Sequence, residues 1–136
     1  MLNINYNTNP HVIFNIVNNK ILICKLPEID LNYLPEFFSQ IKTYIEENDD
    51  LRFLVFDFID INYIDSSIVA GFINIYKLIE KYYENHPLIN IRKSNKIFIY
   101  NIHQNVLKIL EMLKMNKLFI IKKDINEVFE YISNEL

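Results

Sequence analysis

Apolar residues along the chain occur either in short continuous runs or at helical spacing. Residues 51–59, LRFLVFDFI, are almost continuously apolar, which is typical of a strand covered on both faces in a parallel or mixed sheet. Residues 68–83 carry apolar side chains in two adjacent helical stripes, which predicts a helix packed closely on that sheet. A short polar connection ending in Asp65-Ser66-Ser67 lies between them. The chain is organised around this strand, connection and helix.

The N-terminal part of the chain predicts a hairpin. Two strand-like runs, 11–17 and 20–26, flank Asn18 and Asn19. Asparagine tolerates the positive φ that a tight hairpin turn requires, so we expect the two runs to pair in antiparallel fashion.

A first helix is expected after this hairpin. Apolar residues from Leu34 to Ile45 recur at helical spacing. Pro35 lacks a backbone N–H and fits only a first helical turn, so the helix should begin near Asn32. Either Asp30 or Asn32 can serve as its N-cap.

The C-terminal part of the chain alternates between the two patterns. It predicts a strand at 96–101, a helix at 104–115, a short strand at 118–121 and a helix at 124–134. In the last helix, Asp124 can accept from a first-turn amide and Glu127 can reach back to the Asp124 amide. Residues 88–91 can also form a short extended segment. The elements together predict an α/β fold, with a mixed sheet of about five strands and about four helices.

Length and charge narrow the class of protein. The 136 residues suit one domain over 1–136, and the polar residues 1–9 are expected to be a flexible N-terminus. A net charge of −3 gives no basic field, so we expect no nucleic-acid partner. No run approaches the roughly 18 apolar residues of a membrane span, and the first ten residues do not resemble a signal peptide. We therefore expect a cytoplasmic protein without membrane insertion.

Few residues suit cofactor or metal chemistry. Cys24 is the only cysteine, so no intramolecular disulfide can form, and its apolar surroundings favour a buried hydrophobe. The three histidines are widely spaced, which argues against a metal site. Gly71 is the only glycine, so a glycine-rich phosphate loop is excluded. We expect no cofactor and no enzymatic activity.

The polar residues between the central strand and helix allow more than one interpretation. Aspartate and serine are common N-caps, so Asp65, Ser66 and Ser67 can be explained by capping alone. Asp57, at the end of the strand run, needs a polar partner, and ligand sites of open α/β sheets lie at that edge. A small hydrolase or nucleotide-binding protein using Asp57, Asp65 and Ser66 stays open. It requires a concave pocket with a base within reach of Ser66.

Three segments of this region resemble the central signature of the STAS family, the anti-sigma-factor antagonists. They are 54–58 (LVFDF), 64–67 (IDSS) and 72–77 (FINIYK). In that family a hydrophobic strand leads into Asp-Ser-Ser or Asp-Ser-Gly, and an apolar helix follows. Residues 26–30 stand where the family has its first acidic turn, and the later elements follow in the family's order. The resemblance covers nearly the full chain and implies a STAS-like domain.

The resemblance implies a protein-binding switch without catalysis. In the family, the dephosphorylated antagonist binds an anti-sigma factor that is also a serine protein kinase. That kinase phosphorylates the serine after the aspartate, here Ser66, and a serine phosphatase restores the active form. By motif position, the resemblance implies a partner-binding set of Asp30, Asp65, Ser66, Ser67, Ile68 and Phe72.

A second function is compatible with the same fold. The protein would then be a STAS interaction module that is not phosphorylated and forms part of a larger signalling or transport assembly. An exposed hydrophobic patch around Ile68 and Phe72 would favour this alternative.

Overall fold

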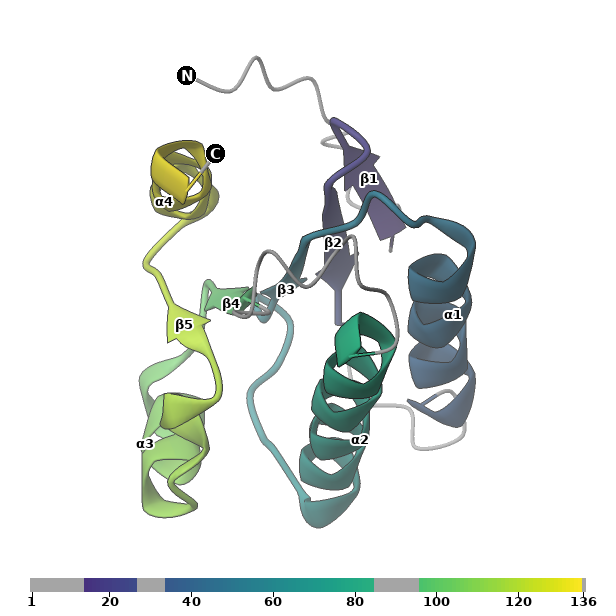
Figure 1. Ribbon diagram of the computed structural model, residues 1–136. Coiled ribbons are helices and arrows are strands. Elements are labelled where there is room, and N and C mark those ends of the chain that lie inside the picture. The colour runs from purple at the N-terminus through teal and green to yellow at the C-terminus, as the bar shows by residue number, and fades with distance from the viewer. Residues whose placement is uncertain (1–13, 27–33, 85–95, 136) are drawn as a thin grey trace.

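The structure is a computed structural model and describes residues 14–26, 34–84 and 96–135 (Figure 1). The predictions for residues 1–9, for a cap at Asp30 or Asn32 and for an extended piece at 88–91 lie outside these ranges. In chain order the elements are β1 Phe14–Val17, β2 Ile21–Lys25, α1 Leu34–Glu47, β3 Phe53–Asp57, α2 Ser66–Glu84, β4 Lys96–Tyr100, α3 Gln104–Met112, the 3₁₀ helix η1 Met115–Lys117, β5 Ile120–Ile121 and α4 Ile125–Glu135.

The five strands form one mixed sheet in the order β1-β2-β3-β4-β5. β1 runs antiparallel to β2, and β2, β3, β4 and β5 are mutually parallel. The predicted mixed sheet with four α-helices is thus confirmed. β3 is central because its apolar residues can be buried on both faces, as the continuous run indicates.

The turn between β1 and β2 is built on the two asparagines. Asn18 and Asn19 have φ values of 54° and 60°, and the Lys20 amide donates to the Val17 carbonyl at 3.1 Å. Positive φ at both positions matches the twist of a hairpin. The predicted hairpin is confirmed, although Val17 pairs with Ile21, so Lys20 also belongs to the connection.

The sheet is covered by helices on both faces. On one face, side chains such as Leu54 and Phe56 of β3 join a buried cluster with α1, α2 and α3. On the other face, Phe53 and Val55 of β3 pack in a second cluster with Val128 and other residues of α4. Figure 1 shows α1 and α2 together on one side of the sheet and α4 across it. The alternation along β3 follows from the two-residue period of a strand.

Phe72 on α2 is the centre of an aromatic cluster. Its ring lies 4.8 Å from that of Phe56 and 5.6 Å from that of Phe58, measured between centroids. The rings of Phe38 and Phe119 lie edge-on to it at 5.5 and 5.7 Å. These contacts join α1, α2, β3 and the segment before β5, so the side chain connects four parts of the core.

Gly71 allows α1 and α2 to approach each other closely. A Cβ atom at this position would overlap the ring of Phe38. Gly71 therefore serves helix packing, since its backbone is helical and needs no positive φ.

We predict that Gly71→Ala lowers the free energy of unfolding by about 1 kcal/mol. The helix gains about 1 kcal/mol from alanine, but overpacking against Phe38 costs about 1–3 kcal/mol. In a Phe38→Ala background the same substitution should stabilise the protein, because the obstructing ring is gone. Urea denaturation of the four variants measures both effects. Stabilisation by Gly71→Ala with Phe38 intact would show that the close contact is absent.

Two helix ends differ from the sequence prediction. The helix expected over 104–115 ends at Met112, and Lys114 follows with a left-handed φ of 58°, a conformation that ends helices. At the start of α4 the Glu127 amide donates to the Asp124 carboxylate at 3.0 Å, as predicted. The Glu127 carboxylate accepts from the Lys123 amide at 2.7 Å, one residue before the amide expected.

Cys24 lies in the core, as predicted. It is fully buried in β2, and burial raises the pKa of its thiol well above the usual value. The sulfur therefore stays protonated at neutral pH and is not a nucleophile.

Candidate functional site

The polar residues singled out in the sequence lie where the central parallel strands end. β2, β3 and β4 run in the same direction, and their last residues are Lys25, Asp57 and Tyr100. The connection 58–65 leaves this edge and leads to the N-terminal end of α2, the lower end in Figure 1. Asp57 is thus the last residue of β3, at the edge where ligand sites of open α/β sheets lie.

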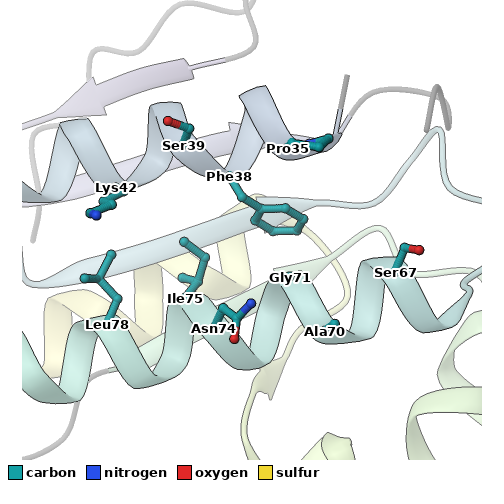
Figure 2. A pocket seen from close by; sticks show the side chains of 10 residues that line it. All are labelled: Pro35, Phe38, Ser39, Lys42, Ser67, Ala70, Gly71, Asn74, Ile75 and Leu78. Carbon is teal, nitrogen blue, oxygen red and sulfur yellow. The ribbon is translucent and has the colours of Figure 1, made fainter. Parts of the chain in front are cut away.

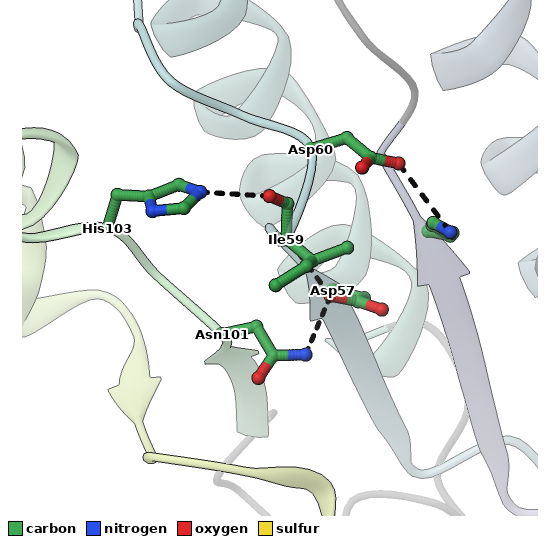
Figure 3. Close-up of polar contacts among 6 residues, drawn as sticks. Asp57, Ile59, Asp60, Asn101 and His103 are labelled. Carbon is green, nitrogen blue, oxygen red and sulfur yellow. Dashed lines mark hydrogen bonds and ion pairs between the residues drawn. The ribbon is translucent and has the colours of Figure 1, made fainter.

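Asp57 organises the start of the connection. Its Oδ1 accepts a hydrogen bond from the Ile59 amide at 3.0 Å and another from the Asn101 side-chain amide at 3.2 Å (Figure 3). On the other side, the Lys25 ammonium lies 3.5 Å from the Asp60 carboxylate. The Asp57 carboxylate thus has the polar partner that its position in the strand requires.

Asp65 is the N-cap of α2. Its Oδ1 accepts from the Ile68 amide at 3.0 Å, and its carbonyl accepts from the Val69 amide at 3.1 Å. The side chain therefore satisfies one of the first-turn amides that have no partner within the helix. Ser66 and Ser67 are the first two residues of α2, and both are exposed.

We predict that Asp65→Ala lowers the free energy of unfolding by about 1 kcal/mol, because the Ile68 amide loses its acceptor. Asp65→Asn should retain most of this stability, since asparagine caps about as well as aspartate. Thermal or urea unfolding of the two variants separates the cap from the charge. Equal losses in both would mean that charge, and not capping, is the stabilising property.

Ile68 and Phe72 were expected to face a partner, and the structure corrects this. Their side chains are 0% and 1% exposed and belong to the core beneath α2. The cause is helical geometry: both residues lie on the stripe that faces the sheet, while Ser66 and Ser67 lie on the opposite side. The exposed residues at the very start of α2 are therefore the two serines. Asp30 lies outside the described residues.

Two exposed apolar side chains lie on the connection and were not singled out from the sequence. Ile59 is 44% exposed and Tyr63 is 60% exposed, whereas Ile61 and Ile64 of the same connection are buried. The connection is neither helix nor strand, so its apolar residues follow neither the helical nor the strand period. The sequence alone therefore could not distinguish its buried residues from its exposed ones.

A groove runs between α1 and α2, with Ser67 in its lining (Figure 2). Its volume is about 670 Å³. Its lining comes from Pro35, Phe38, Ser39 and Lys42 of α1 and from Ser67, Ala70, Gly71, Asn74, Ile75 and Leu78 of α2. Its lining is more apolar than polar. The groove includes Ser67 but none of the three residues required for a hydrolase, Asp57, Asp65 and Ser66.

Asp57 and His103, two bases near this edge, form hydrogen bonds with residues other than Ser66. The Asp57 carboxylate bonds to Ile59 and Asn101, and the His103 imidazole bonds to the Ile59 carbonyl at 2.9 Å. The arrangement of a base acting on Ser66, which hydrolysis would require, is not present among these residues.

Neither a metal site nor a membrane span is found in the part of the chain that the structure describes. There, no group of three or more histidine, cysteine, aspartate or glutamate side chains is placed to hold a metal ion. Of the helices in the same ranges, none has both the length and the apolar content needed to cross a membrane.

Solved structures with the same fold are described as anti-sigma factor antagonists. The anti-sigma factor antagonist SpoIIAA in its unphosphorylated form has a TM-score of 0.70 at 13% identity, covering 96% of this chain and 97% of its own. The Bacillus cell fate determinant SpoIIAA in the phosphorylated form has a TM-score of 0.64 at 12% identity, with coverages of 94% and 99%. At such identities the likeness concerns the fold.

A third structure extends the likeness beyond SpoIIAA. The protein TM1081 from Thermotoga maritima, in its NMR structure, has a TM-score of 0.62 at 19% identity, with coverages of 91% and 90%. No curated protein matches the sequence. The family model of the STAS domain matches residues 16–128, a range that runs from within β1 to the first turn of α4. The chain therefore belongs to the STAS domain family.

Proposed function

We propose that this protein is an anti-sigma-factor antagonist-like signalling protein, which binds an anti-sigma factor of the serine-kinase class and is switched by phosphorylation of Ser66. The partner kinase transfers phosphate to Ser66, and a serine phosphatase removes it. The protein itself acts by binding, in the cytoplasm, without catalysis, nucleic-acid contact or membrane insertion.

The observation that carries this proposal is the exposure of Ser66 at the first position of α2. Its hydroxyl is accessible, and the neighbouring branched side chain of Ile68 turns into the core, where it cannot obstruct a kinase. The SpoIIAA structures support the proposal, because their descriptions name an anti-sigma factor antagonist with an unphosphorylated and a phosphorylated form.

A phosphate at Ser66 is compatible with an intact fold. It adds about −1.5 to −2 charges at pH 7, and at a helix N-terminus it meets amide donors and a favourable dipole. The Asp65 carboxylate is adjacent in the chain, so the modification creates a concentrated negative patch on the surface. Binding is then lost through charge and bulk at the interface.

The proposed partner surface surrounds Ser66. It comprises Asp65, Ser66 and Ser67, together with the exposed apolar side chains of Ile59 and Tyr63 on the connection. Buried aromatic anchors within a polar rim are typical of protein interfaces, and Tyr63 supplies such an anchor. Asp30 stays a prediction for the same surface.

Incubation with a purified serine kinase of the anti-sigma class and ATP tests this function. Intact-mass measurement should show the mass of one added phosphate on the wild-type protein and on Ser67→Ala, and none on Ser66→Ala. Phosphate on Ser66→Ala would place the modification elsewhere, and no phosphate on any form would contradict the switch.

The alternative of an unphosphorylated interaction module is not favoured. It was tied to an exposed hydrophobic patch around Ile68 and Phe72, and both side chains are buried. Such a module would bind its partner equally well before and after treatment with the kinase.

A further inference from the structure

The connection that presents Ser66 is held by polar side chains from a distant part of the chain. The segment that begins after β4 contributes three of them: Asn101, His103 and Asn105. The Asn101 side-chain amide donates to Asp57 Oδ1 at 3.2 Å, and His103 Nε2 bonds to the Ile59 carbonyl at 2.9 Å (Figure 3). The two sides of each contact are 44 residues apart in the chain.

The third contact lies further along the connection. The Asn105 side-chain amide donates to the Asn62 carbonyl at 2.6 Å. Alternate residues 101, 103 and 105 thus contact positions 57, 59 and 62 in order. We call these three donors, Asn101, His103 and Asn105, the clamp.

The chemistry of each clamp residue suits its task. The acceptor of His103 is a carbonyl, so Nε2 must carry the proton, and both the neutral Nε2–H form and the imidazolium satisfy this requirement. Asn101 has a φ of 56°, a left-handed conformation that asparagine tolerates better than most residues. This turn after β4 directs its amide back towards the end of β3.

The connection has no helix or strand of its own, and the clamp complements its apolar anchors. Ile61 and Ile64 are buried in the core and anchor the connection to it. The clamp adds hydrogen bonds to two backbone carbonyls of the connection and to the Asp57 carboxylate. Together they restrict a segment whose exposed residues, Ile59 and Tyr63, belong to the proposed partner surface.

We propose that Asn101, His103 and Asn105 are positioning residues: they fix the 58–65 connection and thereby the place at which Ser66 is presented. The consequence of this restraint for signalling rests on the proposed function, whereas the restraint itself is a property of the isolated protein. The two can fail separately in the following experiment.

Amide hydrogen exchange of the isolated protein, read by NMR, tests the restraint. The reporters are the Ile59 and Ile61 amides, which donate to Asp57 Oδ1 and to the Phe58 carbonyl, both at 3.0 Å. His103→Ala should speed exchange at both by about 5- to 10-fold, the effect of one lost hydrogen bond. His103→Gln, which keeps a donor near the Nε2 position, should restore rates to within about twofold of wild type.

The control distinguishes a local effect from general destabilisation. Exchange at the Val55 amide in β3 should stay unchanged in His103→Ala. Equal acceleration at Val55, or no acceleration at Ile59 and Ile61, would overturn the clamp. Asn105→Ala provides an independent variant at an exposed position and should act in the same direction.

The same variants connect the clamp to the switch. With a serine kinase and ATP, His103→Ala should lower kcat/KM for Ser66 phosphorylation by about 5- to 10-fold, and His103→Gln should recover it. An unchanged kcat/KM in His103→Ala would overturn the positioning role. A wild-type protein that takes up no phosphate would contradict the proposed function, while the exchange rates would still decide whether the clamp exists.

Discussion

Replacing Phe72 with alanine is expected to lower the free energy of unfolding by about 3–5 kcal/mol, the range for large aromatic truncations in a core. The ring is 1% exposed and lies within 6 Å of four other aromatic rings, so its removal leaves a cavity that no single neighbour can fill. Since small domains have a total stability of about 5–15 kcal/mol, the variant should be close to unfolding at 37 °C.

Urea denaturation measures this effect directly. The matched control is Asn74→Ala, an exposed position on the same helix, which should change stability by less than about 0.5 kcal/mol. Phe72→Leu should fall between the two because it retains most of the apolar volume. A loss below about 1 kcal/mol for Phe72→Ala would mean that the aromatic cluster is not the centre of the core.

Ser66→Asp is expected to weaken binding of the anti-sigma partner by about 30- to 150-fold, which corresponds to about 2–3 kcal/mol. The substitution puts a second carboxylate next to Asp65 in the centre of the proposed surface. Ser66→Ala removes the hydroxyl without adding charge, so its affinity should remain within about threefold of wild type. Titration calorimetry with the purified partner measures all three affinities.

The folded state of Ser66→Asp should be as stable as that of the wild type. A negative charge in the first turn of a helix interacts favourably with the helix dipole, by about 0.3–1 kcal/mol. A loss of binding without a loss of stability would therefore locate the effect at the interface. Ser67→Asp, which adds the same charge at the next exposed position, should weaken binding less. Equal binding by Ser66→Asp, Ser66→Ala and wild type would disprove the switch.

The elements of the fold followed from the sequence because their patterns were strong. The continuous apolar run that became β3 and the two stripes of α2 each have one structural solution. The cap at Asp65 was also predictable, since an aspartate before an apolar helix is a local signal. Both features were visible in local sequence patterns, so neither prediction required knowledge of distant contacts.

The error at Ile68 and Phe72 came from combining two kinds of evidence that conflict. Helical spacing already placed both residues with Ile75 on one stripe, which is the face directed to the core. The family resemblance identified the segment as a partner-binding region but contained no information about which side of the helix is outside. Where the two disagree, periodicity is the better guide to burial.

The clamp could not be predicted because its partners are far apart in the chain. His103 and Asn105 were ordinary polar residues in sequence, and nothing marked the Ile59 and Asn62 carbonyls as their acceptors. Such contacts arise only when the parallel order of β3 and β4 brings the ends of both strands to one edge. Pairings of this kind require the sheet topology, which a single sequence does not specify.

The central claim is that phosphate on Ser66 controls partner binding while the fold stays intact. The most direct measurement is the dissociation constant of the partner for this protein before and after phosphorylation, determined on the same preparation, and again after dephosphorylation. We predict that phosphorylation raises Kd at least about 30-fold and that removal of the phosphate restores it. An unchanged Kd for the protein phosphorylated at Ser66 would contradict the claim.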